Sequence, residues 1–248
     1  HLSIRRQRQM CIRDRKKTPS LFLFPLLSTG SKEFITLTIP EGFRLQDIAL
    51  LLEQKEIGKA ENYIRIAHDT TFIRQLGIKT NSLEGYLFPD TYYLEPLSEN
   101  VEADIIKMMV NNFFNNVHHL DLNDSLWPFL IMASIVEKEA RLDHERPIIA
   151  AIFWNRIKLN RPIESCATIL YALDWKKTKL LDSDLQIDSP YNTYRNLGLP
   201  PGPICSPGLK SINAARYPDT TDYLYFVSKG DGSHIFSKTY QEHLEAKI

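Results

Sequence analysis

The 248-residue chain has few cysteines, no net charge and no long hydrophobic run, and each of these features argues against one kind of site or protein class. Its three cysteines, Cys11, Cys166 and Cys205, do not have the spacing of metal ligands or of a redox pair. We therefore expect free thiols, with a Cys166–Cys205 disulfide as the alternative. The seven histidines are scattered without an HExxH-type pair, so nothing predicts a metal or any other cofactor.

Thirty basic residues balance thirty acidic ones. This balance does not predict a nucleic-acid surface and is compatible with a neutral polysaccharide or a peptide as partner. The longest apolar run, 21–27, is interrupted by Pro25 and is far too short to span a bilayer. We expect no transmembrane helix, and the basic start lacks the apolar region and the cleavage site of a signal peptide.

Residues 1–33 differ in composition from the rest of the chain. Their first half, 1–17, is dense in Arg, Gln and Lys and has no apolar pattern. We interpret 1–33 as a basic leader that is disordered or foreign to the protein. A basic arm for nucleic acid or lipid headgroups is the alternative.

From residue 34 onward the pattern becomes that of a folded α+β protein. Alternating residues at 34–39 predict a strand, and two helices are expected at 44–54 and 60–68. The first helix should bury Leu45, Ile48, Ala49 and Leu52. A longer helix is expected at 101–117, with an apolar stripe of Ile105, Met108, Met109 and Phe113.

The C-terminal half alternates helices, loops and two strands. Helices are expected from 143 or 147 to 158, at 209–216 and at 239–247. Strands at 222–228 and 234–237, joined by Gly230-Asp231-Gly232, predict a β-hairpin.

The stretch 131–140 stands out because six apolar or small residues lead directly into Glu137 and Glu139. On a helix, the neighbours of Glu139 would be Met132, Ile135, Val136 and Leu142. Such surroundings remove hydration from a carboxyl group and raise its pKa, as a general acid requires at neutral pH. The alternative is a solvated helix end.

Two loops carry hydrogen-bonding groups and aromatic rings. Segment 82–93 combines aromatic residues with Glu84, Gly85 and Pro89, a composition equally compatible with a sugar cleft and with a core. Segment 189–208 is rich in Gly and Pro, which favours a rigid irregular loop. It contains Tyr191, Asn192, Thr193 and Tyr194, which are either binding groups on a scaffold or turn residues.

Several segments together resemble one family, the endolytic murein transglycosylases or YceG-like proteins. The matching segments occur in the family's order and spacing from about Phe34 to the C-terminus. They are Leu83–Tyr92, Ala133–Glu139, Glu145-Arg146, Asn155-Arg156, Tyr191–Tyr194, Gly198–Ile204 and Tyr223–Val227.

The resemblance implies a LysM-like module at 34–80 and a catalytic domain at 81–248, a mixed α/β domain with a central buried helix and a C-terminal β-hairpin. It implies cleavage of the β-1,4 bond between N-acetylmuramic acid and N-acetylglucosamine in peptidoglycan glycan strands, without a cofactor. It also implies a place on the outer face of the bacterial cytoplasmic membrane, through an N-terminal helix that is missing here, and cell-wall synthesis proteins as further partners.

The resemblance also assigns roles to residues. Glu139 takes the catalytic position and Glu137 a supporting one, while Glu84, Tyr191, Asn192, Thr193, Tyr194 and Asn155 are expected to bind substrate. The chain departs from the family at Ala140, where relatives often have Thr. It departs again at Ser165-Cys166-Ala167, where they often have Asp-Pro, which puts the contacts of this loop in doubt.

One catalytic acid is sufficient for a lytic transglycosylase, because the sugar's own C6 hydroxyl attacks the anomeric carbon. Glu137 and Glu139 would point to nearly opposite sides of a helix and cannot flank one bond. Three alternatives remain at this point. They are a non-catalytic peptidoglycan-binding protein, a water-using glycosidase with Glu84 or Asp90 as second carboxylate, and a metal-dependent hydrolase using His234 and His243.

Overall fold

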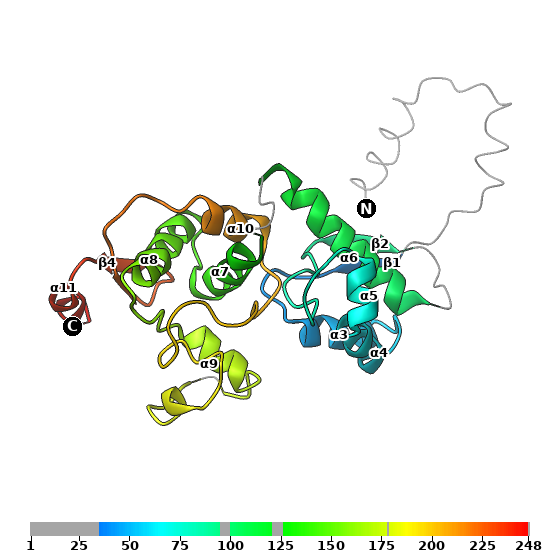
Figure 1. Cartoon of the computed structure of the whole chain (residues 1–248), viewed down its shortest axis with the longest axis horizontal. Coiled ribbons are helices and arrows are strands. Elements are labelled where there is room, and N and C mark those ends of the chain that lie inside the picture. Colours follow the sequence, from blue (N-terminus) through cyan, green and yellow to red (C-terminus); the bar gives the residue numbers. More distant parts are fainter. Residues whose placement is uncertain (1–34, 95–99, 121–125, 178, 248) are drawn as a thin grey trace, which may run out of the picture. The chain divides into compact units, whose positions relative to one another are not determined.

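The computed structural model describes residues 35–94, 100–120, 126–177 and 179–247 (Figure 1). The leader predicted at 1–33 lies outside the described residues. The described residues from Leu37 to Tyr92 and from Asn100 onward form one compact unit, and residues 35–36 and 93–94 group separately. Within the described ranges, no helix is both long and apolar enough to cross a membrane.

The fold is α+β, as the sequence predicts, with two separate two-stranded sheets in the described part. Strand β1 (Ile35–Thr38) pairs with β2 (Thr91–Leu94). Between them lie α3 (Leu45–Gln54), α4 (Ala60–Ala67) and α5 (Thr70–Gln75). The four apolar residues expected on the inner face of α3 are all buried. Helix α5 was not expected from periodicity; the side chain of Asp69 caps it by accepting the N–H of Thr71 at 2.8 Å.

Helix α6 (Val101–Val117) continues into the short 3₁₀ helix η2 (His118–Leu120). Ile105, Met109 and Phe113 are buried as expected, but Met108 is 39% exposed. Assigning Met108 to the apolar stripe was therefore wrong. At about 100° per residue, the buried residues of α6, from Ile105 round to Val110, share an arc of about 140°, and Met108 points about 60° beyond its edge.

Helix α7 (Leu126–Glu139) is the buried centre of the following part, and its seven residues 130–136 are all buried. It packs against α8 (Arg146–Lys158), which follows the 3₁₀ turn η4 (Asp143–Glu145), and against α10 (Leu209–Arg216) (Figure 1). Ser134, buried within α7, accepts the N–H of Ile204 at 3.0 Å. This bond fixes the Gly/Pro-rich loop against the helix.

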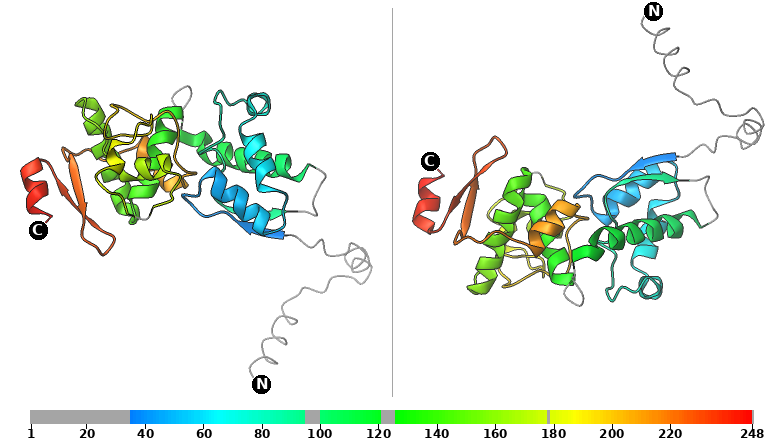
Figure 2. Two further views of the ribbon diagram at one scale, coloured as in Figure 1. Left: turned by 90° about the horizontal axis from the view of Figure 1, so that it is seen from below. Right: turned by 90° about the horizontal axis from the view of Figure 1, so that it is seen from above.

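The C-terminal elements are α9 (Cys166–Ala172), η5 (Asp184–Gln186), β3 (Tyr225–Ser228), β4 (His234–Ser237) and α11 (Tyr240–Glu245). The two strands form the expected antiparallel hairpin, in the register Tyr225 opposite Ser237, and α11 lies beside it (Figure 2). Strand β3 begins three residues later than predicted. The carbonyls of Tyr223 and Leu224 are bound by side chains of α8, so they do not extend the ladder. Cys166 and Cys205 are free thiols, as expected.

Candidate active site

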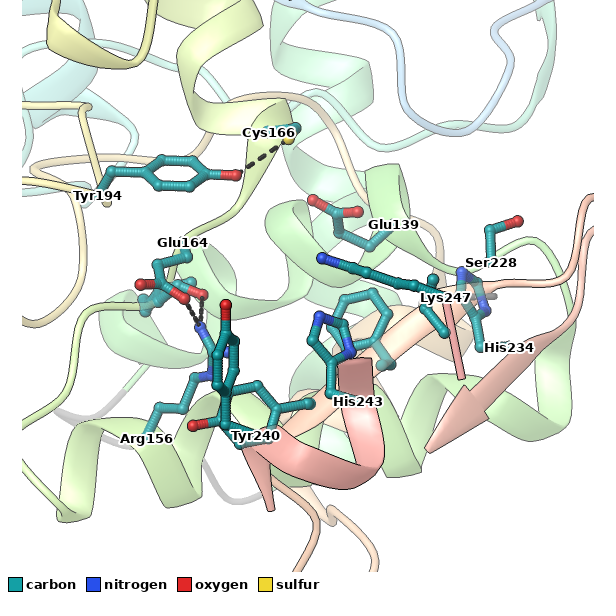
Figure 3. A pocket seen from close by; sticks show the side chains of 14 residues that line it. Glu139, Arg156, Glu164, Cys166, Tyr194, Ser228, His234, Tyr240, His243 and Lys247 are labelled. Atoms are coloured by element: carbon teal, nitrogen blue, oxygen red, sulfur yellow. Dashed lines mark hydrogen bonds and ion pairs between the residues drawn. The ribbon is translucent and has the colours of Figure 1, made fainter. Parts of the chain in front are cut away.

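Glu139, the last residue of α7, faces a cavity of about 560 Å³ (Figure 3). The other walls come from α8, from residues 163–166, from Tyr194, and from the hairpin with α11. The cavity is therefore built from segments that are distant in sequence, and the long apolar helix carries one carboxyl group to its surface.

The carboxyl group of Glu139 has few, specific partners. The Ser165 hydroxyl donates to Glu139 Oε1 at 2.5 Å, and the backbone N–H of Ala167 also donates to this carboxyl. Burial raises the pKa of Glu139, and these two donors partly oppose that shift. The apolar residues before Glu139 predict this rise in its pKa, and this carboxyl is not part of a solvated helix end. It therefore holds a proton more firmly than an exposed glutamate does, which is the property required of a general acid.

Ser165 is in turn fixed by two threonines. Its backbone N–H donates to Thr193 Oγ1 at 3.1 Å, and its carbonyl accepts from the Thr168 hydroxyl at 2.8 Å. The two threonine hydroxyls are 2.8 Å apart. All three residues are at most 1% exposed. The sequence reasoning missed Ser165 as a site residue; its only signal was the departure from the family pattern at 165–167.

Glu137 points to a different part of the protein. Its carboxylate accepts from Arg146 Nη1 at 3.0 Å and from the backbone N–H of Gly208 at 2.9 Å. The side chains of Glu137 and Arg146 are only 6% and 8% exposed. The two glutamates thus have separate surroundings, as their spacing predicts. Glu137 joins the end of α7 to the starts of α8 and α10.

Glu84 and Tyr191 line a second cavity of about 450 Å³, together with Trp127 and Tyr171. The structure does not bring them to the cavity of Glu139. Glu84 accepts the N–H of Leu45 at 3.0 Å, at the first turn of α3. Burial raises its pKa to about 7, although the hydrogen bond from Leu45 opposes the shift. Glu84 is therefore a buried contact between its loop and α3.

The amides expected to bind substrate are occupied within the protein. Asn192 is fully buried and donates to the carbonyls of Leu185 and Ile187 at 3.0 and 2.8 Å. Asn155 donates to the Thr221 carbonyl at 2.7 Å. These contacts, like those of buried Thr193, hold loops in place, and the expected role of the three residues in binding substrate stays a prediction.

Tyr194 does line the cavity of Glu139, and its hydroxyl lies 3.1 Å from Cys166 Sγ. Arg156 and Glu164 also line it and were not expected as site residues, although Arg156 belongs to one of the matching segments. Arg156 Nη1 bonds Glu164 Oε2 at 2.7 Å, and its Nε donates to the Leu224 carbonyl at 2.7 Å. This arginine holds the hairpin to α8 and keeps a second carboxylate in the cavity.

His234 and His243 both line this cavity, but His234 Nδ1 is occupied by Glu145 at 2.6 Å. Over the residues with described positions, no group of three or more His, Cys, Asp or Glu side chains is arranged to hold a metal ion. Among the described residues that line the cavity, Glu139 combines a buried carboxyl with hydrogen bonds from the Ser165 hydroxyl and the Ala167 N–H.

Comparisons with known proteins agree with this description. The sequence profile of the YceG-like family matches residues 15–248. The chain is 40% identical over 241 residues to an endolytic murein transglycosylase of Bacillus subtilis, covering 89% of this chain and 67% of that protein. It is 34% identical over 238 residues to an endolytic murein transglycosylase of Streptococcus pneumoniae, covering 84% of this chain and 43% of that protein.

The fold has a solved counterpart. A crystal structure of a YceG-like protein from Listeria monocytogenes superposes with a TM-score of 0.77 at 37% identity, covering 85% of this chain and 75% of that one. The chain belongs to the YceG-like family. It spans about two thirds of the length of the Bacillus relative and less than half of the pneumococcal one.

Proposed function

We propose that this protein is an endolytic lytic transglycosylase acting on peptidoglycan. It cleaves the β-1,4 bond between N-acetylmuramic acid and N-acetylglucosamine within glycan strands and leaves 1,6-anhydro ends. The observation that carries the proposal is the carboxyl of Glu139, whose pKa is raised by burial and which faces a cavity large enough for a sugar. The names of the relatives, endolytic murein transglycosylases, support the substrate.

In the proposed reaction, Glu139 begins protonated and gives its proton to the glycosidic oxygen as the bond to the anomeric carbon breaks. The C6 hydroxyl of the same sugar attacks that carbon, and its proton finally returns to Glu139. The Ser165 hydroxyl and the Ala167 N–H stabilise the carboxylate that exists between the two transfers. Glu137, bound to Arg146 and Gly208, keeps the end of α7 in position.

The proposal extends to the rest of the chain and to its place in the cell. Residues 34–80 would be a LysM-like module and residues 81–248 the catalytic domain. The protein would act on the outer face of the cytoplasmic membrane, where peptidoglycan lies. The same proposal includes anchoring by an N-terminal membrane helix and cell-wall synthesis proteins as partners.

A water-using glycosidase is the second candidate, and Glu164 is the observation that favours it. This carboxylate lines the same cavity as Glu139, whereas Glu84 lines another cavity and Asp90 bonds Asn112 at 2.9 Å. A hydrolase needs such a second carboxylate, either to activate water or to attack the sugar. However, Glu164 is bound to Arg156 at 2.7 Å, which limits its freedom to act as base or nucleophile.

Product analysis by mass spectrometry tests both candidates. The wild type, Glu139→Gln, Glu137→Gln and Glu164→Gln are incubated with purified peptidoglycan. Internal cuts with 1,6-anhydro ends, abolished in Glu139→Gln and retained in the other two, are expected. Reducing ends that disappear in Glu164→Gln would establish the hydrolase, and glycan binding without cleavage by the wild type would leave a binding protein.

A further inference from the structure

A second pair of titratable groups, His234 and Glu145, lies in the wall of the same cavity. Glu145, in η4, holds His234 at the start of β4 through both carboxylate oxygens. Oε2 is 2.6 Å from the ring nitrogen Nδ1, and Oε1 accepts the backbone N–H at 3.0 Å. The two side chains are 9% and 4% exposed. Two bonds from one buried carboxylate fix both the position and the rotation of the imidazole.

This arrangement determines which ring nitrogen is available. Burial tends to raise the pKa of Glu145, but the hydrogen bonds from His234 hold it below its ordinary value. An ionised carboxylate can only accept hydrogen bonds, so Nδ1 carries the hydrogen. In the neutral ring the lone pair is then on Nε2, which has no hydrogen-bond partner among the residues that the structure describes. His234 lines the cavity that Glu139 faces (Figure 3).

The other polar groups of the cavity are less suited to accept a proton. Glu164 is bound to Arg156, and Tyr194 is hydrogen-bonded to Cys166. His243 stacks on Tyr225 with ring centroids 5.4 Å apart, and burial followed by the charges of Lys247 and Arg156 lowers its pKa. Within the described part of the cavity, His234 is the imidazole that a carboxylate holds in one orientation.

We propose that His234, oriented by Glu145, takes the proton of the attacking sugar hydroxyl and relays it to Glu139. This inference rests on the proposed function and assigns the second proton transfer of that reaction. It makes His234 a catalytic residue and Glu145 a positioning residue.

The relay balances in two stages. First, Glu139 gives its proton to the leaving oxygen while the bond between that oxygen and the anomeric carbon breaks. The C6 oxygen bonds to the same carbon and its proton moves to His234 Nε2. Then the imidazolium, balanced by the Glu145 carboxylate, gives that proton to the Glu139 carboxylate. Both residues return to their starting states, and no further reactant is needed.

The relay has a physical advantage over Glu139 acting alone. Glu139 Oε1 accepts the Ser165 hydroxyl at 2.5 Å, so Oε2 is left for the substrate, and a single oxygen cannot donate a proton and accept another at the same moment. A separate base lets the hydroxyl lose its proton as its oxygen attacks, while Glu139 is still assisting the leaving group. General base assistance of this kind contributes about 10²–10⁴-fold in rate.

The rate of release of 1,6-anhydro products tests the relay. His234→Gln should lower kcat about 100-fold with KM little changed, because the base is lost. A folded His234→Ala protein should regain part of the lost rate when free imidazole is added, which a merely structural role would not allow.

His243→Gln is the matched control, because it removes an imidazole from the same cavity and should leave kcat within about twofold of the wild type. Glu145→Gln should lower kcat with KM unchanged, because an amide can either donate to or accept from Nδ1 and no longer fixes the tautomer. In the wild-type protein, the ¹⁵N NMR signals of the His234 ring should show the hydrogen on Nδ1 and a free lone pair on Nε2. The opposite tautomer would overturn the relay even if the variants fail to fold.

A kcat of His234→Gln within about tenfold of the wild type, or no gain from imidazole in a folded His234→Ala protein, would overturn the relay. Both outcomes are separable from failure of the proposed function. If the wild type gives no 1,6-anhydro ends, the transglycosylase assignment fails. If it gives them at a rate that does not depend on His234, only the relay fails.

Discussion

The Ser165 hydroxyl donates a 2.5 Å hydrogen bond to Glu139 Oε1, across 26 positions of sequence. Ser165 is the N-cap of α9, so the carboxyl of Glu139 meets this hydroxyl and the Ala167 N–H of the first turn together. Both donors favour the ionised carboxyl, while burial favours the protonated one. The acid is therefore placed where small changes in its contacts should change its proton affinity.

Ser165→Ala should weaken catalysis and shift its pH dependence. The hydrogen bond from Ser165 lowers the pKa of Glu139, so its loss should raise that pKa and move the alkaline limb of kcat to higher pH. The carboxylate formed on proton transfer also loses a donor, which should lower kcat roughly 10- to 100-fold. Ser165→Thr keeps a hydroxyl and is the control. An alkaline limb that does not move would mean that Ser165 does not act on the acid.

Glu137→Gln should affect stability far more than chemistry. The Glu137–Arg146 pair is buried, with its atoms 3.0 Å apart, and removing the Glu137 charge leaves Arg146 with only the exposed carboxylate of Asp143 as its partner charge. We expect a loss of about 3–5 kcal/mol in the free energy of unfolding, measured by denaturant titration. Asp143→Asn removes an exposed partner of the same arginine and should change stability little. A Glu137→Gln protein that is stable but inactive would give Glu137 a direct part in the reaction.

The parts of the fold that follow local periodicity could be predicted. The four inward residues of α3 and the exact span of α10 come from apolar spacing, and Glu139 was found because it follows an apolar helix. Met108 shows the limit of this reasoning, because the buried face of α6 is shifted round the helix toward Ile106 and Val110, which the expected stripe did not include.

The remaining site residues could not be read from local pattern, because their partners are far along the chain. The bond between His234 and Glu145 joins positions 89 residues apart, and that between Ser165 and Thr193 joins positions 28 apart. The sequence predicts that the polar residues of 191–194 bind substrate. Only the fold shows that the side chains of Asn192 and Thr193 form hydrogen bonds with buried backbone groups, while Tyr194 lines the cavity.

Thr193→Val tests whether Thr193 supports Ser165 or contacts substrate. Its hydroxyl accepts the N–H of Ser165 at 3.1 Å inside the protein. Valine has a similar shape and leaves that N–H unsatisfied, which should reduce stability by about 1–3 kcal/mol. A supporting role predicts a lower kcat with an unchanged KM. A raised KM with unchanged kcat would instead restore Thr193 as a substrate contact, and Tyr194→Phe, on the cavity wall, provides the comparison for such a change.

Glu84 should give the protein a stability that depends on pH. Burial raises its pKa to about 7 in the folded state, above the usual value for an exposed glutamate. Below about pH 4.5 the carboxyl is protonated in both states and has no such effect. Between that pH and about 7 the unfolded chain releases the proton first, so the folded state should lose about 3 kcal/mol as the pH rises. Glu84→Gln should remove this loss, so the difference in unfolding free energy between wild type and variant, measured from pH 4 to 8, should follow the same curve. A difference that stays constant across this range would mean that Glu84 is ionised in the folded protein and that its bond to Leu45 is made by a carboxylate.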